Sequence, residues 1–309
     1  NQQDGFTKMV LGQGYAGLAV DTCGIANTIN STAHVNLTDS TIQSAGKLQT
    51  IAHTDEKLQV NSYVYSVGLV GGAEAKVTNE LTNDEAIELQ NSSLKTTKAY
   101  QDIILSVADD VKLFTYSYAE CNGIAVGGAS AILNNNLLRS NKLNILSRSS
   151  LYSSQDLNLY AGKLADGGLA MLDLDAEAAD FVGSLVPITI KPSLHNQLEQ
   201  NNQISVDSTS SGASVRHANL YAAAGREMAR LTTGRYVGFY SSSQKQALVT
   251  TDKGETITGK KAQNSITIDG KLIAGVANQI DITIGEERDI VVLAQDMRAA
   301  VSGAKDASN

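Results

Sequence analysis

A long, degenerate repeat constrains the fold of this chain more than any other feature, because similar residues return about every 52 to 57 positions. Segments 33–42, 86–94 and 143–151 each carry an alternating apolar stretch that leads through a polar turn to an isoleucine or leucine. Six residues later another large side chain follows, at Leu48, Tyr100 and Leu157. Self-similarity at a fixed period predicts units that stack on their neighbours instead of closing separate cores. Such a chain presents surface more readily than one deep catalytic pocket.

The first two units share a longer pattern. Small-residue stretches at 68–75 and 123–131 lead into asparagine-containing segments, 78–80 and 134–136, which we interpret as polar turns. Residues 12–30 resemble a third copy of the small-residue stretch. Four large side chains also recur 53 residues later: Leu58, Val60, Tyr63 and Tyr65 as Val111, Leu113, Tyr116 and Tyr118.

Composition favours strands and excludes several partners. Charged residues make up 18% of the chain, and Ser, Thr and Asn, which compete with the helix backbone for hydrogen bonds, are abundant. A formal charge of −8 and a pI near 5.0 argue against nucleic-acid binding and against docking on anionic lipid. No apolar run reaches the roughly 18 residues of a membrane span, so membrane insertion is not predicted. The chain begins without a basic and then apolar leader, so Asn1 is interpreted as the start of a fragment or mature form.

Short runs of alternating apolar and polar residues predict an all-β fold, namely a parallel β-helix (β-solenoid) with irregular loops. At roughly 20 to 25 residues per turn and about 4.8 Å between strands, a dozen or more turns would make a rod about 60 Å long. Stacked turns would align Ser, Thr and Asn side chains into ladders along the axis. The runs are Val35–Leu37, Leu58–Val60, Val111–Leu113, Leu157–Leu159, Ile204–Val206, Ile266–Ile268 and Ile280–Ile284.

The repeat loses regularity toward the C-terminus. We therefore divide one elongated domain into repeats over 1–210 and a less regular continuation over 211–309. Residues 186–192 contain both prolines, which predicts an edge strand or a loop off the rod. Residues 217–235 could form an isolated helix, and residues 289–309 fit either a helix or a further rung.

One motif points toward a cofactor. Residues 12–17 match GxGxxG after an apolar stretch, and Asp39 lies about twenty residues further on, as in dinucleotide-binding units. Such a site also requires a helix after the glycines, and residues 23–32 are poor helix formers. No later βαβ pattern follows, so a chance match is the simpler interpretation and no cofactor is predicted.

Acidic residues provide the catalytic candidates. Asp173, Asp175, Glu177 and Asp180 form the one acidic cluster, and alternating acids on a solenoid face could bind calcium or cleave a polysaccharide. A solvated face is the simpler interpretation, because the calcium-solenoid-like turn at 166–168 does not repeat. We therefore predict no catalytic, cofactor-binding or metal-binding residue.

Four other sets of residues leave their roles open. The arginines could bind a glycan or an acidic partner or be ordinary surface charge, and the histidines show no metal spacing. We interpret the two cysteines as small buried apolar residues, which could form a disulfide bond only if the small-residue stretches stack directly on each other. Tyrosines could form a binding stripe, although Tyr63 with Tyr116 and Tyr65 with Tyr118 are more simply core or rung positions. The arginines are Arg216, Arg226, Arg230 and Arg235, the histidines are His34, His53, His195 and His217, and the cysteines are Cys23 and Cys121.

Parts of the chain resemble a known family. Residues 264–285 (NSITIDGKLIAGVANQIDITIG), 218–222 and 249–254 are similar to segments of the leukotoxin-type filamentous adhesins of bacteria, large exoproteins related in style to filamentous haemagglutinin. The repeated Ser-Thr-Ile and Gly-Gly-Ala-Xaa-Ala units of this chain are also similar to units of those exoproteins, so the resemblance extends over most of the chain. The motifs are degenerate and carry no catalytic residue.

The resemblance implies a right-handed β-helix, secretion to the cell surface, and adhesion or fibre formation. The partner would be a host or bacterial surface receptor or a glycan. Independently, an uncovered end rung is an unpaired strand edge, which predicts end-to-end self-association. The alternative function is an extracellular polysaccharide-degrading β-helix enzyme that uses Asp173 and Asp175.

Overall fold

The structure, a computed structural model, describes residues 6–189, 192–238, 247–249, 259–269, 271–273, 279–294, 297–298 and 307–308. All regular structure in these residues is β-strand, so they contain no helix that could cross a membrane. The predicted all-β class is therefore confirmed. Nearly all strand pairs are parallel, as in a β-helix, with two short antiparallel exceptions.

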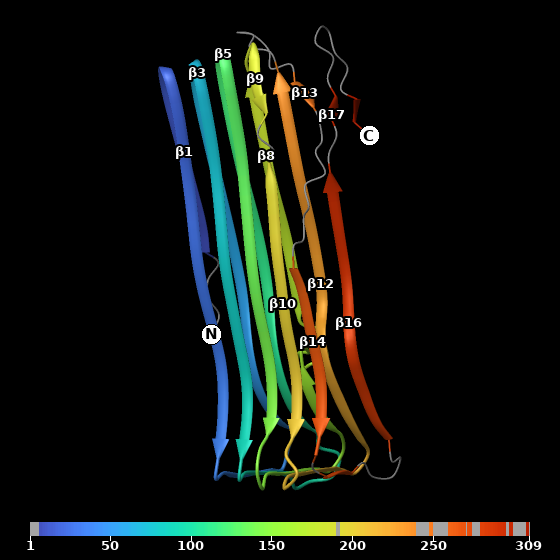
Figure 1. The fold of residues 1–309 in the computed structure, drawn as a ribbon. Coiled ribbons are helices and arrows are strands. Elements are labelled where there is room, and N and C mark those ends of the chain that lie inside the picture. The colour runs from blue at the N-terminus through green and yellow to red at the C-terminus, as the bar shows by residue number, and fades with distance from the viewer. Residues whose placement is uncertain are drawn as a thin grey trace.

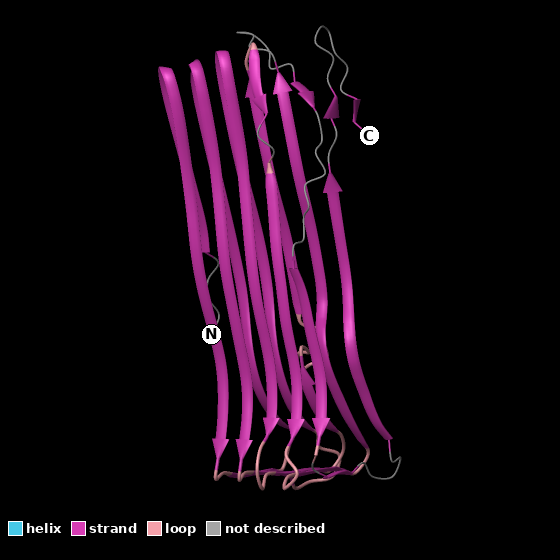
Figure 2. Cartoon of the chain, in the orientation of Figure 1, coloured by secondary structure: helices cyan, strands magenta, loops and turns pink. Residues whose placement is uncertain are grey.

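Three long strands run through the molecule: β1 (Phe6–Thr38), β3 (Leu48–Gln90) and β5 (Ile103–Ile145). Figure 1 shows them side by side, and Figure 2 shows loops gathered at one end, which we call the base. The later passes are broken into β7 (Leu157–Ala161), β8 (Met171–Gly183), β9 (Val186–Thr189), β10 (Ser193–Val206), β12 (His217–Gly238), β14 (Gly259–Ile268) and β16 (Gln279–Ala294). A five-stranded sheet at the base contains β2 (Thr41–Ser44), β4 (Ser93–Thr96), β6 (Ser150–Ser153), β11 (Ser211–Ser214) and β15 (Lys271–Ile273). The remaining strands are β13 (Ala247–Val249), β17 (Met297–Arg298) and β18 (Ala307–Ser308).

Each long strand folds back on itself, so that two walls face each other. Wall A consists of 6–16, 48–68 and 103–123 with β7, β8, β12 and β16, and wall B of 18–38, 72–90 and 127–145 with β9, β10 and β14. Side chains bridge the walls, as where Thr54 donates a hydrogen bond to Glu85 and Arg139 pairs with Asp109. One passage along wall A, back along wall B and across the base is called a unit.

The spacing between units corrects the predicted turn length. Asn27 and Asn79 are hydrogen-bonded neighbours 52 residues apart, and the next two steps span 56 and 61 residues. One turn therefore takes a whole repeat, not 20 to 25 residues. With strands about 4.8 Å apart and residues about 3.3 Å apart, the six layers of wall A, of which β7 and β8 together form one, are roughly 24 Å deep and the walls roughly 66 Å tall. The described part is a tall slab, and the prediction of a dozen-turn rod is wrong.

Strands were predicted too short because their inward positions mix apolar and polar residues. Buried and less buried positions alternate almost throughout β3 and β5. The asparagine segments 78–80 and 134–136 are strand and not turn, and the inward amides of Asn79 and Asn135 are satisfied by neighbouring units. Asn27, Asn79, Asn135 and Asn196 form a ladder in which each Nδ2 donates to the next Oδ1 at 2.8 Å. The predicted polar ladder is confirmed.

Two register predictions and one helix prediction are wrong. Tyr63 pairs with Tyr118 and Leu58 with Leu113, so the predicted spacing of 53 is two residues short. Leu48 pairs with Ile103 and not with Tyr100, which lies exposed in the base connection. Residues 217–235 belong to β12, because parallel pairing with β7 and β8 fixes this segment as strand. Of the segment 289–309, residues 289–294 continue β16, as the rung alternative predicted.

The proline segment follows wall B. Pro187 lies in the four-residue strand β9, which pairs with β5, while Pro192 lies just before β10. Among the described residues β9 has no second strand partner, as an edge strand would.

The fold-back opposite the base depends on glycine. A Cβ on Gly123 would lie 2.1 Å from the carbonyl oxygen of Val126, whereas a Cβ on Gly24 meets no atom within 4 Å. We expect Gly123→Ala to lower the free energy of unfolding by about 1–3 kcal/mol, because the backbone must shift to make room. Gly24→Ala is the matched control and should change it little. Urea unfolding followed by circular dichroism measures both, and equal values would contradict a steric requirement.

Two apolar clusters fill the space between the walls. The cluster farther from the base includes Val60, Leu113 and Leu174, and the cluster near the base includes Ile87, Leu105 and Leu143. Between them lies a layer of buried polar side chains, the polar belt, drawn from residues 54–56, 83–85, 109, 139–141 and 200–202. The core is thus divided at mid-height.

Candidate functional site

The outer face of wall A brings together several residues that the sequence singled out. Lys112 lies in register with Asp173, Phe114 with Asp175, and Tyr116 with Glu177. These side chains are partly exposed, and we call the surface they form with Tyr63, Tyr65 and Tyr118 the tyrosine–acid face. The tyrosines are therefore outward rung positions and not core.

The tyrosines of this face are stacked and tied to one carboxylate. The Tyr63 and Tyr118 ring centroids lie 4.9 Å apart with planes 18° apart, and the Tyr116 ring lies 6.0 Å from Tyr118. Both Tyr63 and Tyr118 donate their hydroxyls to Oε2 of Glu120 at 3.3 Å. Asn122 donates to Oε1 of Glu120 at 2.8 Å. The aromatic row is thus held rigidly across two units.

Ionisation on this face follows burial. Desolvation, together with the nearby Glu120 charge, raises the pKa of the Tyr63 and Tyr118 phenols. Desolvation and the Asp175 charge raise the pKa of Glu177. Tyr63 and Tyr118 are therefore neutral hydrogen-bonding groups at neutral pH, suited to stacking and polar contact.

The acidic cluster is divided between two faces. Asp173, Asp175 and Glu177 lie on the outer face of β8, whereas Asp180 is buried. In the next strand, Arg230 and Arg235 lie in register with Asp175 and Asp180. The described residues contain no group of three His, Cys, Asp or Glu side chains placed to hold a metal ion. Asp173, Asp175 and Glu177 belong to the tyrosine–acid face, and Asp180 does not.

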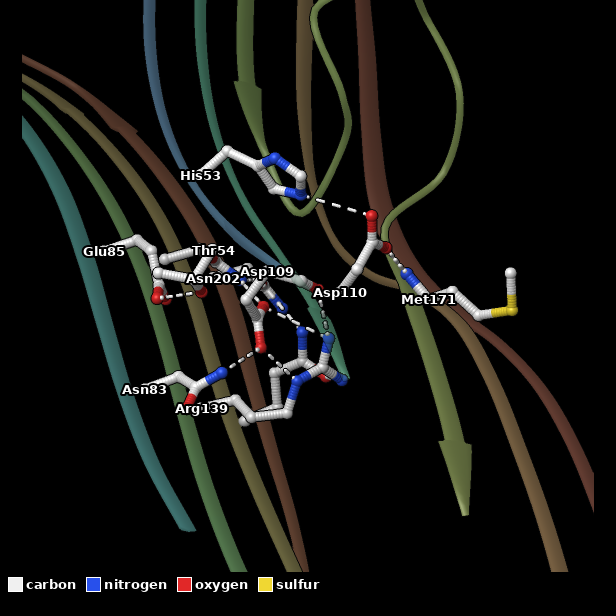
Figure 3. A network of polar contacts seen from close by, with 11 residues as sticks. His53, Thr54, Asn83, Glu85, Asp109, Asp110, Arg139, Met171 and Asn202 are labelled. Atoms are coloured by element: carbon white, nitrogen blue, oxygen red, sulfur yellow. Dashed lines mark hydrogen bonds and ion pairs between the residues drawn. The ribbon is translucent and has the colours of Figure 1, made fainter. Parts of the chain in front are cut away.

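Sequence reasoning missed the polar belt, which Figure 3 shows. Asp109 is fully buried, and it accepts hydrogen bonds from Nε and Nη2 of Arg139 and from Nδ2 of Asn141 at 2.8 Å. Arg139 also donates Nη1 to Gln200 at 3.0 Å. The signal was present, since these residues occupy inward positions of strands whose period-two alternation continues through them.

Three acids share the interior with one guanidinium. Burial and the Asp109 charge raise the pKa of Glu85 to about 9, and burial raises that of Glu56. The Thr54 hydroxyl donates to Oε1 of Glu85 at 2.6 Å. These groups are buried between the walls, and the belt links wall A to wall B.

Three histidines form pairs between units. His34 lies 3.2 Å from Asp84, His53 lies 3.2 Å from Asp110, and His217 Nδ1 lies 3.8 Å from Asp156. The hydrogen bond to Asp110 raises the pKa of His53. Burial would raise the pKa of Asp110, but the hydrogen bonds from His53 and from the backbone amide of Met171 lower it overall. His195 is exposed on wall B. The spacing between units thus positions three of the four histidines opposite carboxylates.

Other predicted features have ordinary structural roles. The GxGxxG segment 12–17 lies within strand β1, without the helix that a dinucleotide site requires. Cys23 and Cys121 are buried and not bridged. The turn at 166–168 lies in the loop between β7 and β8. In this turn, Asp166 accepts a hydrogen bond from the backbone amide of Gly168.

Wall B carries an open depression of about 450 Å³. Lys142 pairs with Asp84 at 3.3 Å in its lining. The lining also includes Thr82, Leu138 and Glu199, together with the belt residues Asn83, Arg139 and Gln200. Asp173 and Asp175 do not line it. The depression is therefore separate from the acid pair.

Comparison with known proteins gives no family. No family model, no curated protein and no solved structure matches this chain. Function must therefore be argued from the geometry alone.

Proposed function

We propose that this chain is a segment of a right-handed parallel β-solenoid from a secreted or cell-surface bacterial filamentous adhesin. Its role is structural and adhesive, without a catalytic step. The slab holds outward-facing side chains at fixed spacing and presents them to a host or bacterial surface receptor or a glycan.

The asparagine ladder is the observation that carries this proposal. Four amides from four successive units are joined at 2.8 Å, and three of them are buried to 2% exposure or less. An unpaired buried amide is costly, so each unit fixes the register of the next. A chain built this way resists shear between units, as a stalk or fibre must.

A ladder of serine side chains near the base also links successive units. The backbone amides of Ser40, Ser92 and Ser149 each donate a hydrogen bond to the serine hydroxyl oxygen of the following unit, at 3.0–3.3 Å. Asp39, Asn91 and Arg148 take positive φ at the same corner in three units. The same backbone conformation therefore recurs in three units although the residue type differs, which supports a solenoid.

The tyrosine–acid face is the surface best suited to contact. It combines stacked rings, neutral hydroxyls and half-exposed acids on rigid strands, so little conformational entropy is lost when a partner binds.

Electron microscopy of the material from its native source, with far-UV circular dichroism of the same sample, tests the proposal. We expect thin fibres or rods with a strand-dominated spectrum. Compact particles with a strong helical signal would overturn both the solenoid and the adhesin assignment.

A further inference from the structure

The open depression on the outer face of wall B spans three successive units. Its volume of about 450 Å³ lies within the roughly 300–1,000 Å³ of small-molecule sites. Its lining combines residues of β3, β5 and β10. Each of these strands is paired on both sides, β3 with β1 and β5, and β10 with β5 and β14. The depression therefore lies within the wall and not at either end of it.

One apolar side chain lies among the polar outward positions of the depression. Leu138 is aligned with Thr82 of the preceding unit and with Glu199 of the following unit. It is half-buried on the outer face, and the next outward residues along its strand, Asn136 and Ser140, are polar. Leu138 thus forms a small apolar patch in a polar surface. Small-molecule sites combine apolar contact with a few placed polar groups in this way.

Two carboxylates and one ammonium surround this patch. Lys142 Nζ lies 3.3 Å from Oδ1 of Asp84, and His34 Nε2 lies 3.2 Å from Oδ2 of the same carboxylate. Glu199 accepts a hydrogen bond from Nε2 of Gln197 at 2.8 Å. The side chains of Asp84 and Lys142 remain 38% and 37% exposed. They are therefore accessible to a ligand in positions that the protein already fixes, which reduces the entropy lost on binding.

The floor of the depression is fixed from the interior. Asn83 and Arg139 also line it, and both side chains donate hydrogen bonds to the buried Asp109, as Figure 3 shows. Gln200 in turn accepts a hydrogen bond from Arg139 at 3.0 Å. The polar belt therefore holds the floor in place, and a ligand meets a preformed surface.

We propose that this depression binds a neutral sugar ring, as one unit of an extended glycan. Each sugar hydroxyl both donates and accepts hydrogen bonds. Neighbouring hydroxyls therefore match a lining in which Asp84 and Glu199 accept and Lys142 donates. The apolar face of the ring packs on Leu138. Because the depression is open, the glycan continues from the ring along the wall on either side.

The charges of the lining select a neutral ligand. Outside the belt they are the carboxylates of Asp84 and Glu199 and the ammonium of Lys142. An anion would approach two carboxylates, and a cation would compete with Lys142 for Asp84. A neutral ring gains hydrogen bonds to charged groups, which are stronger than those between neutral groups, without adding a charge. This site is separate from the tyrosine–acid face, and it does not require that the chain be part of a filament.

Saturation-transfer NMR with neutral trisaccharides of glucose, galactose, mannose and N-acetylglucosamine tests the site. At least one of them should bind to the wild type. Lys142→Met should weaken that binding about tenfold or more, the loss expected for a hydrogen bond to a charged group. Leu138→Ser should weaken it several-fold through lost apolar contact. Lys76→Met, the same substitution at an exposed position of β3 outside the depression, is the matched control and should bind as the wild type does.

Three results would contradict this inference: no signal from any of the four trisaccharides, equal affinities for the wild type and Lys142→Met, or tighter binding of trigalacturonate than of every neutral probe. The last would indicate an anion site at Lys142. The test is independent of the proposed function. Fibres that bind no sugar would leave the filament standing without this site, and compact, helical particles that bind sugar through Lys142 would do the reverse.

Discussion

Replacing Arg139 by Met is expected to lower the free energy of unfolding by about 3–5 kcal/mol, the cost typical of breaking a buried ion pair. The Arg139 side chain is 2% exposed and that of Asp109 is fully buried. Without the guanidinium, the Asp109 carboxylate keeps only amide donors such as Asn141, and its charge has no compensation between the walls.

Two further variants separate the charge from the packing. Arg139→Met combined with Asp109→Asn removes both charges and should regain part of the lost stability. Lys142→Met breaks the exposed pair with Asp84, whose side chains are 37% and 38% exposed, and should cost under about 1 kcal/mol. Chemical denaturation of all three gives the comparison. A loss for Arg139→Met no larger than that for Lys142→Met would show that the belt does not hold the walls together.

The strand class and the stacking of units could be predicted from the sequence, whereas the size of a unit could not. Leu37 and Leu89 align in the structure as in the repeat, and Gly71 aligns with Gly127. The turn length was missed because polar residues at inward positions, such as Asn79 and Asn135, read as turns. Only pairing with a neighbouring amide makes such a residue acceptable in a strand core.

Register errors had a different origin. The predicted spacing of 53 differs from the observed pairing of Tyr63 with Tyr118 by two residues, which leaves every side chain on its correct face. Period-two patterning therefore fixes the face and not the register. Register is set by contacts far apart in sequence, such as the ladder and the Asp109–Arg139 pair, and no local pattern reports them.

Candidate site residues were predicted less well than the fold. The acids and tyrosines were recognised separately, but their juxtaposition, for example Tyr116 beside Glu177, requires the 61-residue separation between those strands. The polar belt was absent from the prediction altogether, because Glu85 lies in β3 while Asp109 and Arg139 lie 30 residues apart on the two walls of β5.

Replacing Glu85 by Gln is expected to make the protein more stable at pH 8 and to flatten its pH dependence. The pKa of Glu85 is raised from an ordinary 4.5 to about 9, so the folded state keeps this proton where the unfolded chain has released it. The folded state then binds more protons, and stability falls as pH rises from about 4.5 to about 9, by roughly 1.4 kcal/mol per pH unit at most.

Gln imitates the neutral acid, because it retains an acceptor for the Thr54 hydroxyl and has no proton to lose. Between pH 5 and pH 8 the wild type should therefore lose up to about 4 kcal/mol relative to Glu85→Gln. Glu88→Gln, on the outer face of the same strand, is the matched control and should keep the wild-type slope. Urea unfolding at pH 5, 6.5 and 8 measures all three proteins. Parallel pH profiles for the wild type and Glu85→Gln would mean that Glu85 is ionised in the folded protein, and that the belt accommodates three carboxylates around a single arginine.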